Sequence, residues 1–301
     1  MNQALFDSLR AALRGEMVPE ASLSACTTWR VGGPAELLIV PADRDDLRQA
    51  LALLAASGTP WLVIGAGSNL LVKDGGVRGA VLKLSRLREV TFGEDGLVTA
   101  EGGLPLMSLI RGCVERGLAG LERLAGIPGT LGGGIAMNAG AGGQQLSEVV
   151  TTVTLTGPEG EEEWPAERFD FGYRRCRLPA GRVVTAARLA LHSADREALL
   201  GEVEGRIAHR RQAHRVGGPN AGSVFKNPPG GQAWELIDRA GLRGMRIGGA
   251  EIATRHTNFI VNRGGATAAD ILALIDLTRR RVREGAGIEL ETEVRIVGED
   301  R

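Results

Sequence analysis

The sequence contains few of the residues that mark a secreted or membrane-spanning protein. Its three cysteines are odd in number and far apart among 301 residues, which argues against a disulfide framework and for a reducing compartment. No uncharged apolar run reaches the ~20 residues that span a bilayer. The first fourteen residues mix charges with apolar residues at helical spacing, so no signal peptide is expected. These absences predict a cytoplasmic protein without membrane insertion.

Lysine and histidine are also scarce. Only three of the 36 basic residues are Lys, and with Arg this abundant a single Arg is weak evidence of function. The 36 acidic residues balance the charge, so nothing predicts binding to nucleic acid. The four His show no metal-ligand spacing, and no metal site is expected.

Glycine, in contrast, is concentrated between residues 120 and 143, where nine of 24 residues are Gly. Apolar residues interrupt this run, so it does not resemble a flexible linker. Glycine backbone can lie directly against a ligand, and clustered amides form concave anion sites that suit phosphate. The run therefore predicts an ordered cofactor cradle, and the alternative is a tightly packed structural turn.

A shorter glycine run, Gly65–Asn69, directly follows the strand-like segment Trp61–Ile64. A strand followed by glycines is the order that a phosphate-binding turn needs. The run lacks the third spaced glycine of a Rossmann fingerprint, so taken alone it is a weak signal for a dinucleotide.

The pattern of apolar residues predicts an α+β protein in two lobes. A charged helix over Asp195–Arg215 marks a change of segment, and we expect one domain over residues 1–200 and another over 201–301. Further helices are expected at the N-terminus and over Asp43–Ser57, Leu104–Arg116, Ala233–Ala240 and Thr267–Glu284, the last with Thr267 as a cap. Strands are expected over Val149–Thr156, Arg182–Leu191, His256–Asn262 and Ile288–Val297.

The segment Asn220–Pro228 contains polar groups suited to chemistry. Ser223 offers a hydroxyl and Lys226 a cation, with Gly222 allowing a close turn. A serine acts as a proton donor or nucleophile only if its neighbours tune it. No Gly-x-Ser-x-Gly elbow surrounds Ser223, so hydrolase chemistry is not expected, and the alternative is a serine in a turn.

The segment Phe171–Arg175 contains Tyr173, the only tyrosine of the chain. The planar donors of an Arg suit a carboxylate or a phosphate, because they bind two oxygens at once. The alternative is a surface Arg, and position alone does not separate Arg174 from Arg175.

Near the C-terminus, Ile288–Ile296 alternates between apolar and charged residues. The pattern is typical of a strand with one solvated face, or of a strand that places a carboxylate in a site. Periodicity does not choose among Glu289, Glu291 and Glu293.

These motifs, in this order, resemble the UDP-N-acetylenolpyruvoylglucosamine reductases, also called UDP-N-acetylmuramate dehydrogenases. The resemblance extends over nearly the whole chain, and the order of seven segments makes it specific. The segments are Thr28–Pro34, Gly65–Leu71, Leu121–Gly140, Phe171–Arg174, Ala221–Pro228, His256–Asn262 and Leu290–Arg295.

The resemblance implies a bacterial, cytoplasmic flavoenzyme of peptidoglycan synthesis, and we expect a monomer. It implies a two-lobed FAD-binding fold of the vanillyl-alcohol-oxidase/PCMH type with a smaller α+β substrate-binding domain. In this family NADPH reduces non-covalently bound FAD. The reduced flavin then gives hydride to the enolpyruvyl group of UDP-N-acetylglucosamine enolpyruvate, which yields UDP-N-acetylmuramate.

The family motifs also imply roles for individual residues. Arg174 would stabilise developing charge, Ser223 would donate a proton, and Glu293, selected by its Glu-Val-Arg context, would act as the acid. The implied cofactor-binding residues are Gly65, Ala66, Gly67, Ser68, Asn69, Leu70, Gly126, Ile127, Pro128, Gly129, Thr130, Gly132, Gly133, Ala136, Asn138, Ala139 and Gly140. The implied substrate-binding residues are Tyr173, Arg210, Arg211, Lys226, Asn227, His256 and Asn258.

Two departures from the family pattern stand out. The larger form of the family closes over its substrate with a loop tyrosine after the Tyr-Arg motif, and this chain has no tyrosine beyond Tyr173, so it resembles the compact second type. The family often has Arg-Arg-x-x-Gln-Pro before the serine segment, where this chain has Arg210–Arg215 without the Gln-Pro pair. Either Arg210 or Arg211 is expected to meet the nucleotide diphosphate.

Two other functions are compatible with the same residues. One is a sugar or alcohol oxidase with the same FAD lobe, although such enzymes commonly tether flavin through His or Cys, and neither glycine run contains His. The other is a nucleotide-sugar binding module without catalysis, which would contain no flavin.

Overall fold

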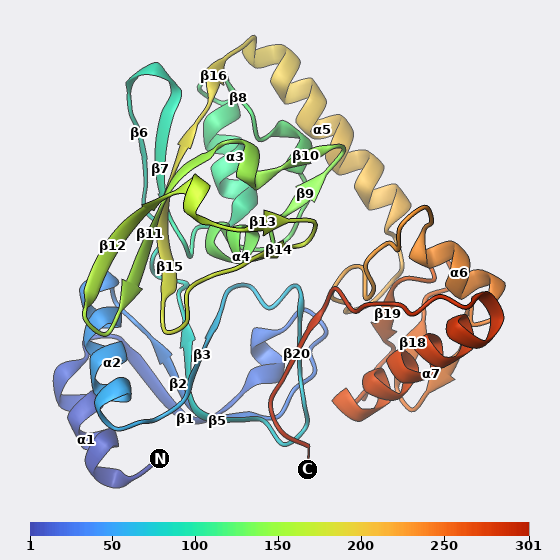
Figure 1. The fold of residues 1–301 in the computed structure, drawn as a ribbon, viewed down its shortest axis with the longest axis horizontal. Helices are drawn as coiled ribbons and strands as arrows, with labels where there is room; N and C mark the ends of the chain where they lie inside the picture. Colours follow the sequence, from blue (N-terminus) through green and yellow to red (C-terminus); the bar gives the residue numbers. More distant parts are fainter. Residues whose placement is uncertain (301) are drawn as a thin grey trace. The chain divides into compact units, whose positions relative to one another are not determined.

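The computed structural model describes residues 1–300 and divides into two compact units (Figure 1). The first unit contains Met1–Pro19, Leu37–Ala66 and Gly79–Arg210. The second contains Glu20–Glu36, Gly67–Arg78 and Arg211–Arg301. The boundary between the two units falls within helix α5 (Arg196–Ala213). The second unit also includes two segments from the early part of the chain, which the sequence pattern did not predict.

The N-terminal part of the chain combines two helices with a four-stranded sheet. Helix α1 (Gln3–Ala12) begins at Asn2, whose side chain accepts a hydrogen bond from the Leu5 amide, and helix α2 (Arg44–Ala56) begins in the same way at Asp43. Both helices were predicted. The sheet has the order β1-β2-β5-β3, with bounds β1 (Glu16–Ser22), β2 (Pro34–Val40), β5 (Val77–Lys83) and β3 (Trp61–Ile64).

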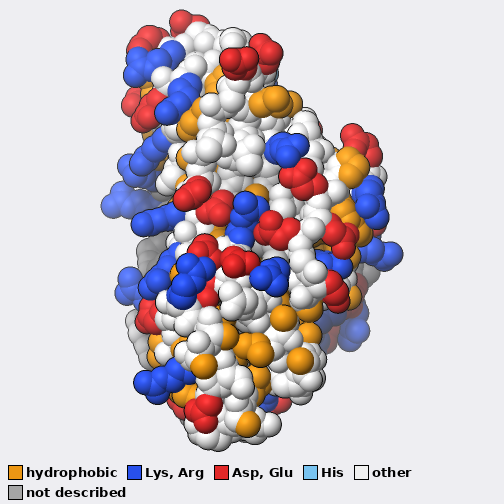
Figure 2. Space-filling view, turned by 90° about the vertical axis from the view of Figure 1, so that its left-hand side faces the viewer, with side chains coloured by type: hydrophobic (Ala, Val, Ile, Leu, Met, Phe, Trp, Pro, Cys, Tyr) orange, Lys and Arg blue, Asp and Glu red, His pale blue; other side chains and the backbone are white. Residues whose placement is uncertain are grey.

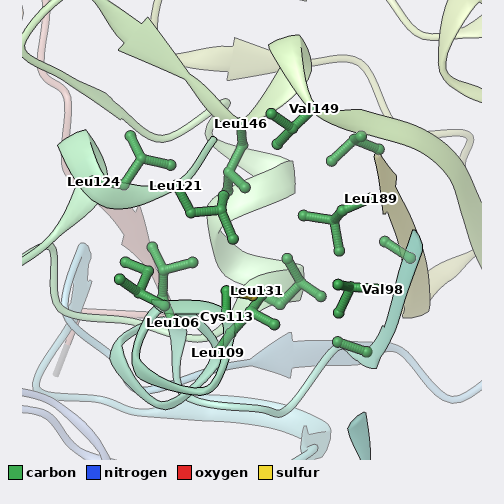
Figure 3. Close-up of a cluster of buried hydrophobic side chains, with 14 of the residues drawn as sticks. Val98, Leu106, Leu109, Cys113, Leu121, Leu124, Leu131, Leu146, Val149 and Leu189 are labelled. Carbon is green, nitrogen blue, oxygen red and sulfur yellow. The ribbon is translucent and has the colours of Figure 1, made fainter. Parts of the chain in front are cut away.

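A five-stranded antiparallel sheet forms the middle of the first unit. Its order is β12-β11-β15-β7-β6, with bounds β12 (Gly160–Pro165), β11 (Val150–Gly157), β15 (Val183–Ala190), β7 (Leu97–Glu101) and β6 (Val90–Phe92). The strands predicted over 149–156 and 182–191 are therefore confirmed. Helices α3 (Leu106–Val114) and α4 (Leu131–Ala136) contribute to the same core (Figure 3), where Leu109, Leu131 and Leu189 are fully buried.

Short elements complete the first unit. Strand β8 (Leu118–Ala119) pairs with β16 (His192–Ser193), β9 (Gly140–Ala141) with β10 (Gln144–Gln145), and β13 (Phe171–Gly172) with β14 (Arg175–Cys176). The first unit also contains four short 3₁₀ helices, η2 (Glu94–Gly96), η3 (Glu122–Leu124), η4 (Leu146–Glu148) and η5 (Ala166–Arg168). A fifth, η1 (Leu23–Cys26), belongs to the second unit.

The second unit is built on a three-stranded sheet and two helices. The sheet has the order β17 (Arg246–Ile247), β18 (Ala250–Ile252) and β19 (Ile260–Asn262), and the helices are α6 (Ala233–Arg239) and α7 (Ala268–Ala286). A separate parallel pair joins β4 (Leu70–Val72) to β20 (Arg295–Val297). The indole N–H of the fully buried Trp29 donates to the carbonyl of Ile260 at 2.7 Å, so the early segment is part of this core.

Helix α7 starts at the predicted cap. Thr267 accepts the Asp270 amide, the Asp270 side chain accepts the Thr267 amide, and Gly287 ends the helix in the left-handed conformation. Asp74 adds a second cap, because its two carboxylate oxygens accept the amides of Ala268 and Ala269, each at 2.9 Å.

The strand predicted over Ile288–Val297 is wrong in extent. Only Arg295–Val297 is a strand, because the residues before it run beside the serine segment through single contacts, including a bridge between Phe225 and Thr292. The alternation of burial nevertheless holds, since Leu290 and Val294 are buried while Glu289 and Glu291 are exposed.

Basic and acidic side chains are interspersed on the face of the first unit that carries α1, α2 and β12, as Figure 2 shows. A charged hollow of about 480 Å³ lies at the start of α2, where Arg44 pairs with Glu101 and Glu161. Burial raises the pKa of the Glu101 carboxyl. Within residues 1–300, none of the helices combines the length and the apolar character that crossing a membrane requires.

Candidate active site

The two glycine runs meet inside the first unit. Strand β3 delivers the chain to Gly65, and a Cβ atom on Gly65 would lie 2.6 Å from Oγ1 of Thr130. Thr130 also caps helix α4 by accepting the Gly133 amide at 3.4 Å. The strand and the glycine turn predicted from the sequence are therefore adjacent to the longer run.

Part of the glycine content serves packing rather than ligand access. The amide of Gly132 donates to the carbonyl of Gly102 at 2.8 Å, and a Cβ atom on Gly132 would approach that oxygen to 3.1 Å. Gly126 and Gly129 have φ values of +84° and +137°, which side chains rarely allow. The run therefore packs tightly, as the alternative interpretation held, and its role as a cofactor cradle stays a prediction.

Arg174 lies at the end of the longer glycine run. It occupies the two-residue turn between β13 and β14, with φ of +55°. Its Nη1 atom is 3.3 Å from the place where a Cβ atom on Gly140 would stand. A Cβ atom at 140 would also stand 2.8 Å from the Gln144 carbonyl oxygen, so the lack of a side chain here serves the backbone turn as well as the guanidinium. The structure thus brings together two motifs that lie 34 residues apart. The ring of Tyr173, 53% exposed, is centred 5.3 Å from Cζ of Arg174.

Arg210 and Arg211, either of which could meet the nucleotide diphosphate according to the sequence, have different surroundings at the end of helix α5. The stem of Arg210 packs on the glycine run, with Cδ 2.9 Å from the place of a Cβ atom on Gly126. Arg211 follows on the exposed surface of the helix. The compact units also change between these two residues.

In the second unit, Asn258 holds the segment that carries Ser223. The Asn258 side chain is 4% exposed, accepts the Phe225 amide at 2.9 Å and donates to the Phe225 carbonyl at 2.8 Å. Its own carbonyl accepts the Val224 amide at 2.9 Å. These bonds fix the backbone next to Ser223, which is partly buried. The substrate contact expected of Asn258 stays a prediction.

Glu293 reaches the same place from the other side. Its amide donates to the Val224 carbonyl at 2.8 Å, one residue after Ser223. The side-chain amide of Asn69 donates to the Glu293 carbonyl at 3.0 Å. The second unit therefore brings together Ser223, Glu293 and the Gly67–Asn69 end of the shorter glycine run.

Several predicted substrate residues surround this centre. Lys226 pairs with Glu291, and the side chain of Asn227 accepts the Ala233 amide at the start of α6. His256 stacks edge-on against Phe259, with ring centroids 4.7 Å apart, and burial lowers the pKa of its imidazole. In the part of the chain that the structure describes, no group of three His, Cys, Asp or Glu could hold a metal ion.

The sequence did not predict three of the contacts that hold these motifs. Thr28 donates its amide to the Gly67 carbonyl at 3.1 Å, Asn138 binds the Arg174 hairpin, and Asp74 caps α7. All three were in or beside motif segments, but their partners lie 34 or more residues away, where no spacing rule applies.

Comparison with known proteins decides the family. The family model for the FAD binding domain matches residues 35–164, and the model for the UDP-N-acetylenolpyruvoylglucosamine reductase C-terminal domain matches residues 212–297. The UDP-N-acetylenolpyruvoylglucosamine reductase of Syntrophotalea carbinolica is 53% identical, over 92% of this chain and 93% of the relative. The chain belongs to the UDP-N-acetylenolpyruvoylglucosamine reductase family.

Solved structures agree with this family membership. The crystal structure of the Thermus caldophilus reductase is similar with a TM-score of 0.80 and 36% identity, over 94% of this chain and 99% of the other. A glucose dehydrogenase, Phl p 4.0202, is similar in fold alone, with a TM-score of 0.52 and 15% identity over 74% of this chain and 52% of its own. The predicted α+β, FAD-binding fold of the vanillyl-alcohol-oxidase/PCMH type is confirmed.

Proposed function

We propose that this chain is an NADPH-dependent flavoenzyme that reduces the enolpyruvyl group of UDP-N-acetylglucosamine enolpyruvate to give UDP-N-acetylmuramate in peptidoglycan synthesis. One observation carries the proposal. In a chain of the reductase family, the Arg174 guanidinium lies against Gly140, within the unit that contains most of the match to the FAD binding domain. A cation that close to a cofactor cradle suits a substrate carboxylate reduced at that cradle.

The residues present fit FAD. Both glycine runs present backbone without side chains, and they meet where Gly65 touches Thr130. We assign to FAD the cofactor-binding residues expected from the sequence. At Asn138 only the backbone is assigned to FAD, because the side chain forms hydrogen bonds to Gln145, Gly172 and Ser147 within the protein. When bound, FAD supplies hydride chemistry, while the protein orients and polarises the substrate. Neither glycine run contains His, so we propose that FAD is bound without a covalent tether.

The three catalytic residues act on the charge and the proton of the substrate. Hydride at the outer vinyl carbon places negative charge on the inner carbon and the adjacent carboxylate. Arg174 stabilises that charge where it develops, and Glu293 assists as the acid. The Ser223 hydroxyl donates its proton to the inner carbon, which completes the reduction.

The remaining proposals concern substrate and setting. Arg210 binds the nucleotide diphosphate, since it lies on the glycine run while Arg211 is exposed. Tyr173, Lys226, Asn227 and His256 line the substrate site. We assign FAD binding to residues 1–200 and substrate binding to residues 201–301, with Tyr173 and Arg174 of the first range also meeting the substrate, and we propose a cytoplasmic monomer.

An assay of NADPH oxidation with and without UDP-N-acetylglucosamine enolpyruvate tests the proposal. Oxidation that does not depend on the substrate would contradict it, and a colourless protein would favour a binding module instead. Flavin that stays on the chain after denaturation would favour a tethered oxidase.

Half-reactions separate the roles further. Ser223→Ala should leave flavin reduction by NADPH within twofold and slow flavin reoxidation by the substrate by about 10²–10⁴, as expected for a lost general acid. Ser22→Ala, an exposed serine of the same unit, is the matched control and should change neither rate. Equal losses in both halves for Ser223→Ala would refute its role as proton donor.

A further inference from the structure

Asn138 belongs to the glycine-rich cofactor run, yet its side chain points into the protein. The residue is 2% exposed and has φ of +41°, a region that side chains rarely occupy. Asn is one of the few residues that adopt this conformation, and such strain persists only where the surrounding contacts fix it. The contacts of Asn138 should therefore serve a purpose beyond a turn.

Three segments are tied together by this one amide. Its Nδ2 donates to the Gly172 carbonyl at 3.2 Å and to Oε1 of Gln145 at 2.9 Å, while its Oδ1 accepts the Ser147 amide at 3.1 Å. Because two acceptors lie next to Nδ2 and a donor lies next to Oδ1, the hydrogen bonds determine which end of the Asn138 amide is nitrogen and which is oxygen.

Gly172 is the last residue of β13, directly before the turn formed by Tyr173 and Arg174. The hairpin β13–β14 pairs only two residues on each strand, and so small a hairpin is marginal by itself. Figure 1 shows it beside α4, the helix that immediately precedes Asn138. Phe171 and Cys176 of the hairpin pack against the core, and the hydrogen bond from the Asn138 side chain to the Gly172 carbonyl supports the backbone directly before the turn that carries Arg174.

The same run meets Arg174 a second time, because the guanidinium lies against Gly140, two residues after Asn138. Residue 138 thus fixes the backbone of the turn, and residue 140 leaves space for its charged end. We infer that Asn138 is a positioning residue, which sets the guanidinium of Arg174 against the cofactor run for the substrate half of the reaction. This inference rests on the proposed function.

Two variants and one control test it. Asn138→Gly removes the amide and adopts φ of +41° without strain. Asn138→Asp keeps the shape but places an oxygen opposite the Gly172 carbonyl. Gln145→Ala removes one partner of Asn138 and leaves the bond to Gly172, so it controls for local loosening. Each holoenzyme is measured by stopped flow in both half-reactions.

We expect Asn138→Gly and Asn138→Asp to keep their flavin and to be reduced by NADPH within threefold of the wild-type rate. Reoxidation by UDP-N-acetylglucosamine enolpyruvate should slow by about 10–100-fold, because a catalytic group misplaced by about 1 Å can cost as much. Gln145→Ala should slow it less than threefold.

A double-mutant cycle with Arg174→Ala gives the readout that a merely structural role would not produce. If Asn138 acts through Arg174, then Asn138→Gly should slow reoxidation no further in the Arg174→Ala background. Additive losses, equal losses in both half-reactions, or loss of flavin from Asn138→Gly would overturn the inference. If Arg174→Ala itself reoxidises at the wild-type rate, the role of Arg174 in the proposed function fails and the inference with it. Failure at Asn138 alone leaves the proposed function standing.

Discussion

Glu251 offers the sharpest test of how the second unit supports the Ser223 segment. Its carboxylate is 3% exposed, and Arg246 and Arg263 donate to its two oxygens, the latter at 2.7 Å. Arg263 also donates to the Gly217 carbonyl at 2.6 Å, in the stretch that leads to Ser223. The carboxylate therefore links strand β18 to the loop before the proposed proton donor.

The expected loss of unfolding free energy depends on the burial of the Glu251 carboxylate and on the exposure of its two Arg partners. Removing one partner of a fully buried ion pair costs about 3–5 kcal/mol, and a hydrogen bond to a charged group is worth about 1.5–3 kcal/mol. The side chains of Arg246 and Arg263 are 65% and 32% exposed, so solvent screens the charge left behind. We therefore expect Glu251→Gln to cost about 2 kcal/mol, near the lower range.

Hydrogen exchange measures this cost within the second unit. A loss of about 2 kcal/mol should speed exchange of the β18 and β19 amides about 30-fold, where they exchange by opening of that unit. The matched control is Glu289→Gln, whose carboxylate is 52% exposed and pairs with Arg279. It should cost less than about 1 kcal/mol, as exposed pairs do. Exchange of Glu251→Gln within threefold of wild type would refute the reasoning.

The same residue predicts a pH dependence. Hydrogen bonds from Arg263, and also from Arg246, hold the pKa of the Glu251 carboxyl below its usual range against the opposing effect of burial. The unfolded chain then binds more protons than the native one below about pH 4.3, so the stabilisation is complete above that value and is lost as the pH falls through the native pKa. Protection of β18 should fall more steeply in wild type than in Glu251→Gln, and parallel curves would contradict the assignment.

Three further predictions concern single side chains. Trp29→Phe removes an indole N–H from a buried carbonyl and should cost about 1–3 kcal/mol in urea unfolding; no change would show that the bond contributes nothing. Asp74→Ala removes the second cap of α7 and should cost about 1 kcal/mol, with faster exchange confined to the first turn of that helix. Burial lowers the pKa of His256, so the native state disfavours its charged form and stability should fall as the pH drops below about 6.5; an NMR titration midpoint at or above that value would contradict this.

Local signals predicted the helices well. Helix α7 begins at the expected Thr267 because a cap and its partner lie within one turn of each other, and α2 begins at Asp43 for the same reason. Strand β3 runs into Gly65 as expected, since a short apolar run followed by glycine is also a local pattern. Signals of this kind need only a few neighbouring residues, which the sequence displays directly.

Contacts between segments that are distant in the chain have no local signal in the sequence. Trp29 binds Ile260 across 231 positions, and the residues around it belong to the second unit although they come early in the chain. Of the strand expected over 288–297, only Arg295–Val297 forms, because the residues before it pair with the segment around Phe225 through no more than an isolated bridge. Alternation reports which side chains are buried, but the partner strand decides whether a ladder forms.

The choice among three glutamates shows what geometry adds to a pattern. Glu289 pairs with Arg279 and Glu291 with Lys226, so both carboxylates take part in ion pairs at the surface. The Glu293 backbone instead binds the neighbour of Ser223 and the side chain of Asn69, which places it between the proposed proton donor and one of the two glycine runs. Of the three, only Glu293 is placed by its backbone between the Ser223 segment and Asn69. This position is compatible with the proposed role of Glu293 as the acid, which stays a proposal.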